Sequence, residues 1–175
     1  MNIDDAARSL KVRQFKKPLE YSACWQSMKR FTETRQSDSL DEVWLLEHKP
    51  VFTQGIRESA KDLIDSGDIP VVKTDRGGLI TYHGPGQLLI YLMLDLRRLG
   101  AGLKYLVNIL EQSTIDVLGE HGIQAARKEN APGVYVDGSK IASLGLRVQR
   151  GCTYHGLSLN VDMDLSPFDR IVPCG

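Results

Sequence analysis

The stretch VYVDGSKIASLGLRV, residues 134–148, decides the fold that we expect for this chain. Asp137-Gly138 between two runs of strand-forming residues is a strong signal for a two-residue hairpin turn, so the runs are predicted to be antiparallel neighbours. In a strand of period two, Lys140 shares a face with the apolar residues 142, 144 and 146. An ammonium group among apolar side chains needs a partner or a task. The hairpin therefore marks Lys140 as a candidate functional residue on a rigid scaffold, although a lysine after a turn is more often simply solvated.

Periodicity outside the hairpin predicts helices and further strands. Apolar residues at helical spacing predict one helix over 21–31 and another over 103–118 that ends near Gly119 or Gly122. The polar segments 35–39 and 58–68 are predicted loops. We therefore expect an α+β fold, with helices packed against a mainly antiparallel mixed sheet. The predicted strands are 43–47, 71–73, 79–82, 88–94, 133–136, 140–148 and 157–161.

Composition indicates an ordinary globular protein. The chain has 175 residues, 42% hydrophobic and 25% charged, with a formal net charge of zero. These values predict one domain over 1–175 and give no electrostatic reason to expect binding to nucleic acid or to an anionic membrane. Within this domain, residues 1–18 are expected to be peripheral. The N-terminus shows no secretory pattern and no apolar run approaches the length of a membrane span. We expect a cytoplasmic protein.

The three cysteines, Cys24, Cys152 and Cys174, have no metal-binding or redox spacing, so neither a disulfide framework nor a metal site is predicted. Cys174 lies in a Pro-Cys-Gly turn and is the candidate nucleophile. A nearby ammonium raises the thiolate fraction of a cysteine, and Lys140 is the candidate neighbour. The alternative is that Cys174 is a small buried apolar residue, as free cysteines often are.

The segment RGGLITYHGPGQ, residues 76–87, reads as a loop and strand built around a ligand. Paired glycines let backbone approach a substrate closely, and free N–H groups at Gly77 and Gly78 could serve as oxyanion donors. A plain glycine-rich hairpin explains the composition equally well. The tetrapeptide Thr-Tyr-His-Gly at 81–84 recurs at 153–156, which suggests two walls of one site, with histidines bonded in the core as the alternative.

Six ordered motifs are spread over most of the chain: RGGLITYHGPGQ at 76–87, APGVYV at 131–136, KIASLG at 140–145, GCTYHG at 151–156, NVDMDLSPF at 160–168 and PCG at 173–175. Together they resemble the lipoyl(octanoyl) transferase family over residues 20 to 175. This resemblance implies a biotin/lipoate protein ligase-like fold of the class II synthetase type. It also implies an ATP-independent acyltransferase that moves an octanoyl or lipoyl group from acyl carrier protein to a lysine of a lipoyl domain through a cysteine thioester.

The resemblance also assigns roles to single residues. It places the acyl-thioester cysteine at Cys174 and the lysine that activates it at Lys140. The substrate-contacting residues that it implies are Arg76, Gly77, Gly78, Leu79, Ile80, Thr81, Tyr82, His83, Ser143, Leu144, Gly145, Gly156, Leu157 and Ser158.

The resemblance implies no cofactor, because the acyl group arrives on the phosphopantetheine arm of the carrier protein. The implied acceptors are the lipoyl domains of 2-oxoacid dehydrogenase complexes and the glycine cleavage H protein. The chain ends at Gly175, one residue after Cys174, where similar proteins continue, so its C-terminus is short for the family. Two alternatives stay open: an ATP-dependent lipoate or biotin protein ligase, and an acyl-binding module without activity.

Overall fold

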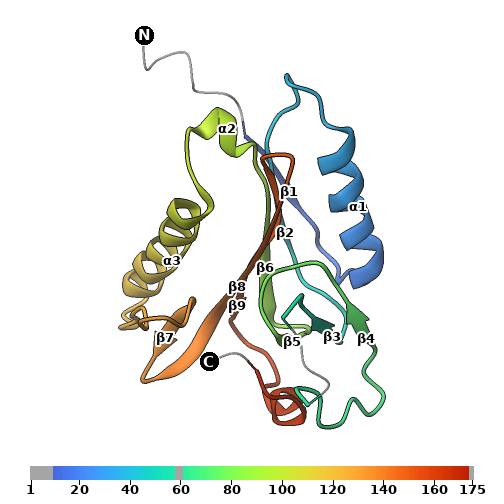
Figure 1. Ribbon diagram of the computed structural model, residues 1–175. Helices are drawn as coiled ribbons and strands as arrows, with labels where there is room; N and C mark the ends of the chain where they lie inside the picture. Colours follow the sequence, from blue (N-terminus) through green and yellow to red (C-terminus); the bar gives the residue numbers. More distant parts are fainter. Residues whose placement is uncertain (1–9, 58–60, 174–175) are drawn as a thin grey trace.

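A six-stranded mixed sheet forms the centre of the computed structural model, which describes residues 10–57 and 61–173 (Figure 1). All its neighbouring strands are antiparallel except the first pair, which is parallel. In spatial order the strands are β1 (Lys11–Gln14), β2 (Glu42–Leu46), β6 (Gln87–Met93), β9 (Cys152–Asn160), β8 (Ser139–Gln149) and β7 (Val134–Val136).

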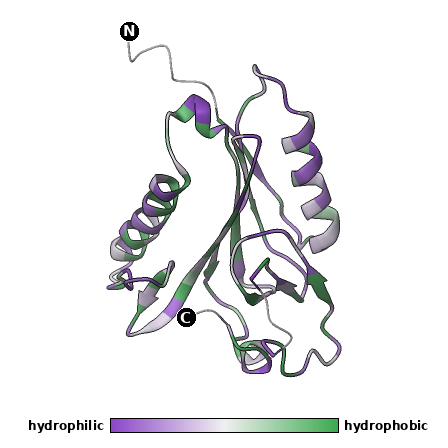
Figure 2. Cartoon of the chain, in the orientation of Figure 1, coloured by the Kyte–Doolittle hydropathy of each residue, from purple (hydrophilic) through white to green (hydrophobic). Residues whose placement is uncertain are grey.

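Two helices cover opposite faces of this sheet (Figure 1). On one face, α1 (Tyr21–Thr34) packs Cys24 and Met28 against Trp44, Leu89 and Tyr154. On the other, α3 (Leu103–Glu120) packs against a cluster that contains Val134, Ala142 and Leu157. Both helices alternate between hydrophilic and hydrophobic residues, as expected of helices with one face in the core (Figure 2).

A smaller sheet lies beside the large one, on the side of α1 (Figure 1). It consists of β4 (Val71–Lys73), β3 (Val51–Gln54) and β5 (Ile80–His83), with β3 in the middle. Phe52 and Tyr82 of this sheet pack with Ile171 and with Phe168 of the short 3-10 helix η2 (Ser166–Arg170). The small sheet therefore has its own apolar support and can hold β5 against the large sheet.

The predicted hairpin is confirmed. Asp137 and Gly138 have positive φ angles of 49° and 81°, which a two-residue turn of this type requires at both positions, and Val136 pairs with Ser139 directly after it. Ala142 and Leu144 share one apolar cluster with α3 residues, and Leu146 packs in the neighbouring one. The face predicted from period two is therefore the face that α3 covers.

Both predicted helices and the predicted strands are present, with shifts of up to three residues at most ends; the strand predicted over 157–161 is β9, which begins five residues earlier, at Cys152. Four elements of the described chain were not predicted: β1, β3, the four-residue helix α2 (Leu96–Leu99) and the 3-10 helix η2. β1 is an exposed edge strand without alternation, so residues 11–14 belong to the sheet rather than to a peripheral segment. Within the described ranges, no helix is long and apolar enough to span a membrane.

Candidate active site

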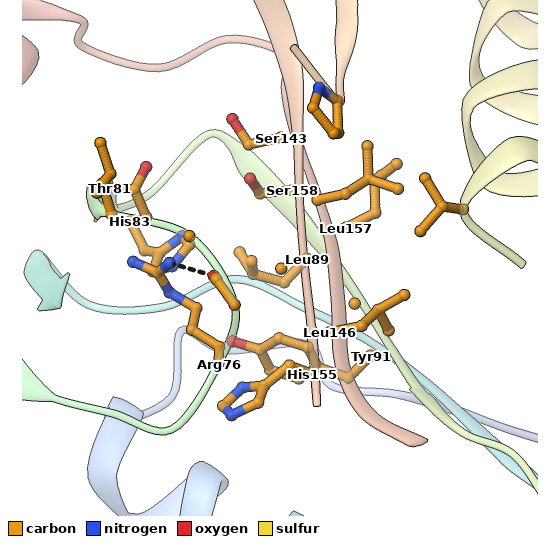
Figure 3. A pocket seen from close by; sticks show the side chains of 18 of the residues that line it. Arg76, Thr81, His83, Leu89, Tyr91, Ser143, Leu146, His155, Leu157 and Ser158 are labelled. Carbon is orange, nitrogen blue, oxygen red and sulfur yellow. Dashed lines mark hydrogen bonds between the residues drawn. The ribbon is translucent and has the colours of Figure 1, made fainter. Parts of the chain in front are cut away.

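A cavity of about 230 Å³ lies between the β8–β9 pair and the segment that runs from Arg76 into β5 (Figure 3). Ser143 and Ser158 are cross-strand partners at its wall, with Leu89, Tyr91 and Leu157 nearby. The volume is below the roughly 300–1,000 Å³ that is typical of sites for drug-sized ligands. The cavity is therefore suited to a small ligand, and its lining combines apolar side chains with polar ones such as Arg76 and Lys140.

The structure brings the predicted substrate-contacting residues together around this cavity, with one exception. Tyr82 lies outside it, where its ring packs against Phe52 and Phe168. The histidines of the two Thr-Tyr-His-Gly copies, His83 and His155, both line the cavity. Both are also buried and bonded in the core, His83 to Gln87 and His155 to Asp75, so both interpretations of the repeat stay open.

Two glycines leave one step of the β8–β9 wall of the cavity without side chains. Gly145 and Gly156 are direct cross-strand partners, so this step of the wall carries no side chains. A Cβ atom at Gly156 would overlap the carbonyl oxygen of Ile90 on β6. The position therefore admits only glycine without a shift of the central strands.

Arg76 is buried and fixes the loop that covers the cavity. Its Nε donates to Thr53 Oγ1 at 3.1 Å, its Nη2 donates to the Thr53 carbonyl oxygen at 2.6 Å, and its Nη1 donates to the Gly77 carbonyl oxygen at 2.9 Å. Because one guanidinium joins β3 to the loop through several donors, Arg76 holds the glycine turn in place as well as lining the cavity.

The hypothesis that both glycine N–H groups at 77–78 are free oxyanion donors is wrong for Gly77. Its N–H donates to the Leu146 carbonyl oxygen at 3.2 Å. Leu146 lies beyond the part of β8 that pairs with β7. Buried backbone donors are almost always paired, and here the partner comes from the opposite wall. The Gly77 N–H group therefore joins the loop to β8.

Lys140 lies at the boundary between this cavity and a second groove. The groove is lined in part by Val136, Ile141 and Val161. The Lys140 ammonium lies over the ring of its cross-strand partner Tyr135, 5.4 Å from the ring centroid. The predicted nucleophile, Cys174, lies outside the described residues. A cation that lines a cavity can stabilise a thiolate or a developing oxyanion beside it.

The two described cysteines do not line the cavity. Cys24 packs inside the α1 core, where burial raises the pKa of its thiol to about 12. Cys152 is buried at the start of β9, where its sulfur lies 3.8 Å from the guanidinium of Arg97. Among the described residues, no group of three histidine, cysteine or acidic side chains is placed to hold a metal ion.

Three histidines are buried in this part of the structure, and two of them, His83 and His155, line the cavity. His48 is bonded on both ring nitrogens, to the Leu19 carbonyl oxygen at 3.0 Å and to the Tyr91 hydroxyl at 2.8 Å. Burial lowers its pKa to about 4, and burial also lowers the pKa of His83 and of His155 below the ordinary value. All three imidazoles are therefore neutral at pH 7.

Acidification is expected to destabilise the fold because it charges buried histidines. The pKa of each buried histidine is lower in the folded protein than the value of about 6.5 in an unfolded chain. The stability that the neutral ring provides is therefore complete above pH 6.5 and is lost as the pH falls towards the pKa of the folded state. For His48 this loss amounts to about 3 kcal/mol between pH 6.5 and pH 4. Urea denaturation at pH 7.5, 5.5 and 4.5 measures it. His48→Gln should flatten the profile, whereas His121→Gln, at an exposed position, should leave it unchanged; equal slopes in both variants would contradict the assignment.

Sequence reasoning missed several apolar residues of the cavity. Their spacing predicted core packing, which they also provide, and nothing in one sequence separates a core residue from one that lines a cavity in the core. They are Tyr21 of α1, Leu89 and Tyr91 of β6, and Leu103 and Val107 of α3.

Comparison with known families gives a match over nearly the whole chain. The model of the lipoyl protein ligase A/B catalytic domain matches residues 20–175. An octanoyltransferase of Pseudomonas syringae pv. syringae (strain B728a) is 59% identical over 157 residues, which are 90% of this chain and 72% of that protein. An octanoyltransferase of Pseudomonas putida (strain W619) is 61% identical over 155 residues, 89% of this chain and 72% of that protein.

Solved structures with the same fold are more distant in sequence. A T. acidophilum protein with bound lipoic acid has a TM-score of 0.77 at 13% identity, covering 92% of this chain and 72% of that chain. A lipoate protein ligase from Thermoplasma acidophilum, described together with its E2 lipoyl domain, has a TM-score of 0.67 at 14% identity, covering 93% of this chain and 66% of that chain. The biotin protein ligase of Aquifex aeolicus has a TM-score of 0.55 at 15% identity, covering 92% of this chain and 57% of that chain. These likenesses confirm the predicted fold.

Proposed function

Because the chain belongs to the lipoyl protein ligase A/B catalytic domain family and is about 60% identical to curated octanoyltransferases, we propose that it is the acyltransferase that delivers octanoyl groups to protein lysines in lipoylation. The donor is an octanoyl thioester on acyl carrier protein. The acceptor is the lysine of a lipoyl domain, in 2-oxoacid dehydrogenase complexes or in the glycine cleavage H protein.

The first step exchanges one thioester for another. The Cys174 thiolate attacks the acyl carbonyl carbon, a new carbon–sulfur bond forms, and the carbon–sulfur bond to the phosphopantetheine thiol breaks. The departing phosphopantetheine thiolate takes a proton from the Lys140 ammonium, which leaves Lys140 as a neutral amine. Both bonds are thioesters, so the exchange is nearly balanced in energy and needs no ATP. The Lys140 ammonium favours this step by stabilising the Cys174 thiolate.

The second step forms an amide. The acceptor amine attacks the Cys174 thioester, the carbon–nitrogen bond forms, and the cysteine sulfur leaves. Since a lysine with its ordinary pKa of about 10.4 is almost entirely protonated at pH 7, the reaction needs a group that takes a proton from the acceptor. We assign this role to Lys140, as a neutral amine after the thioester has replaced the negative thiolate.

The observation that carries the proposal is the cavity that begins at Lys140 and continues between Ser143, Leu157 and Leu89. Its lining includes the apolar side chains of Leu89, Leu144 and Leu157, against which an acyl chain can pack. Burial of the chain's methylenes, at about 0.8 kcal/mol each, provides about 5 kcal/mol for recognition.

We place the protein in the cytoplasm, where both proposed protein partners act. The free thiols of Cys24 and Cys152 in the described structure are compatible with a reducing compartment. We propose that the protein needs no cofactor of its own, because the activated acyl group arrives as a thioester.

Intact-protein mass spectrometry after mixing with octanoyl carrier protein, without nucleotide, tests the proposal. We expect a mass increase of one octanoyl group that hydroxylamine removes, because thioesters react with hydroxylamine. Subsequent addition of a lipoyl domain should transfer the group to its lysine. Labelling that requires ATP and free octanoate would indicate a ligase instead, and tight binding without covalent change would indicate an inactive acyl-binding module.

A further inference from the structure

Glu111 is a buried carboxylate on α3 that does not line the cavity. Its Oε1 accepts a hydrogen bond from the Gly133 N–H group at 2.9 Å, and its Oε2 accepts one from Arg127 Nε at 3.0 Å. Arg127 also donates from Nη2 to the Asn108 carbonyl oxygen of α3 at 2.8 Å. A buried charge is costly unless it is paired and hydrogen-bonded, and here both oxygens are. Glu111 therefore joins α3 to residues near both ends of the 126–135 segment, which leads into β7 (Figure 1).

Gly133, one of the residues that Glu111 holds, lies directly against Lys140. A Cβ atom at Gly133 would lie 3.1 Å from Lys140 Cε, 3.3 Å from Lys140 Cδ and 2.8 Å from the Ala142 carbonyl oxygen. Its φ angle of 140° also lies in the range that favours glycine. The backbone at this position thus packs on the aliphatic part of the Lys140 side chain, and a side chain here would displace it.

Tyr135 contacts Lys140 from the same segment. The Lys140 ammonium lies over its ring, and the Tyr135 hydroxyl donates to the Ala131 carbonyl oxygen at 3.0 Å, which fixes the ring to the segment. The Gly133 backbone and the Tyr135 ring therefore contact Lys140 as parts of one piece of chain. Because Glu111 anchors that piece to α3, the anchor acts on the position of Lys140.

The β7–β8 pairing is irregular directly after Lys140. Tyr135 pairs with Lys140 and Val134 pairs with Ala142, so Ile141 is an extra residue on β8. A bulge of this kind bends a strand and redirects its side chains, and bulges are common next to active sites. The direction of the Lys140 side chain therefore depends on how β7 lies against β8, and not on β8 alone.

We propose that Glu111 is a positioning residue for Lys140. By binding Arg127 and Gly133 it holds the 126–135 segment against the Lys140 side chain and keeps the ammonium beside the cavity. The inference rests on the proposed function, since it takes Lys140 to be the cation and base of the transfer. Glu111 itself contacts neither the cavity nor the reacting atoms.

Glu111→Ala tests the proposal because it removes both anchors. The Lys140 ammonium should then lie less firmly beside the cavity, and the Cys174 thiolate should form at higher pH. We expect the midpoint of iodoacetamide alkylation at Cys174 to rise by about one pH unit, the lower end of the range that a nearby opposite charge produces. Glu111→Gln still offers an acceptor oxygen to the Gly133 N–H group and should restore most of the wild-type profile.

Tyr135→Phe is a milder change that tests the same link if Glu111→Ala does not fold. It keeps the ring beneath Lys140 and removes the hydrogen bond to Ala131. The alkylation midpoint should move in the same direction as in Glu111→Ala, but by less. An unchanged midpoint in both Tyr135→Phe and a folded Glu111 variant without its carboxylate would overturn the inference.

Glu42→Ala is the matched control for loss of a buried, paired carboxylate. Glu42 accepts hydrogen bonds from Arg13 Nε at 2.6 Å and from Trp44 Nε1 at 2.7 Å, and it does not line the cavity. Its removal should lower the melting temperature and leave the alkylation profile unchanged. A shift in Glu42→Ala as large as that in Glu111→Ala would show a general effect of destabilisation and would overturn the inference.

NMR of protein labelled with ¹³C at the lysine ε-carbon separates this inference from the proposed function. The Lys140 signal is assigned by its loss in Lys140→Arg. In Glu111→Ala it should move towards the position of a solvated lysine, because contact with the Tyr135 ring is weakened, and in Glu111→Gln it should stay. If Lys140→Ala leaves the alkylation profile unchanged, the proposed role of Lys140 fails, and the NMR signal alone then supports the inference by moving or overturns it by staying constant.

Discussion

Cys174→Ala is expected to abolish both the octanoyl adduct and octanoyl transfer to a lipoyl domain. The reaction proposed here passes through a covalent bond to the cysteine sulfur, so no partial route remains when the sulfur is absent. Removal of a nucleophile from such a site commonly costs 10³-fold or more, roughly, in turnover. Hydroxylamine-sensitive labelling by octanoyl carrier protein and single-turnover transfer measure the two steps separately.

Cys152→Ala serves as the control for loss of a thiol, because Cys152 is buried away from the cavity. It should label and transfer like the wild-type protein. An adduct that persists in Cys174→Ala, or that maps by peptide sequencing to Cys24 or Cys152, would rule out the mechanism while leaving the family assignment intact.

Lys140→Ala is expected to slow both steps, each by about 10²–10⁴-fold, because it removes the cation that favours the thiolate and the amine that takes the acceptor's proton. Lys140→Arg separates the two roles, since arginine remains a cation but does not act as a base at accessible pH. The pH profile of iodoacetamide alkylation at Cys174 reports the thiolate, and delivery to a lipoyl domain reports the second step. Lys140→Arg should restore alkylation of Cys174 more than delivery to the lipoyl domain.

Lys128→Ala is a matched control for Lys140. The Lys128 ammonium also lies over the Tyr135 ring, 5.6 Å from its centroid, but Lys128 does not line the cavity. Loss of a cation next to Tyr135 is therefore common to both variants, and loss of activity is expected only for Lys140→Ala. Unchanged alkylation and transfer in Lys140→Ala would show that Lys140 is a surface residue after a turn.

The parts of the fold that were predictable are those in which local signals agree with the final packing. Asp137-Gly138 permits the positive φ angles of the turn, and period-two alternation continues through β8, so the hairpin and its covered face followed from sequence. β3 was missed because all four of its residues are buried and show no alternation. β1 was missed for the opposite reason, since its four residues are all exposed at an edge.

The sequence predicted the parts of the site that are rich in glycine or carry a charge among apolar residues. It did not predict the parts whose residues have the spacing of ordinary core residues. The 76–83 segment and the 143–145 and 156–158 stretches stand out by their glycines, and all but Tyr82 line the cavity. Tyr21 and Leu103 also line it, yet their helical spacing indicates packing alone. Asp75 accepts hydrogen bonds from Trp25 and Tyr154, which lie 50 or more residues away along the chain, and no local pattern can reveal such contacts.

The position of β9 has a consequence for how the chain folds. β9 lies between β8, its neighbour in sequence, and β6, which precedes it by about sixty residues, so the sheet stays divided until β9 is added. The cost in chain entropy of closing such a long loop slows folding, which predicts milliseconds to seconds rather than microseconds. During synthesis on the ribosome, β6 emerges well before its partner and presents an unpaired apolar edge. This interval is when the nascent chain is most exposed to aggregation, and when a chaperone would have a surface to hold.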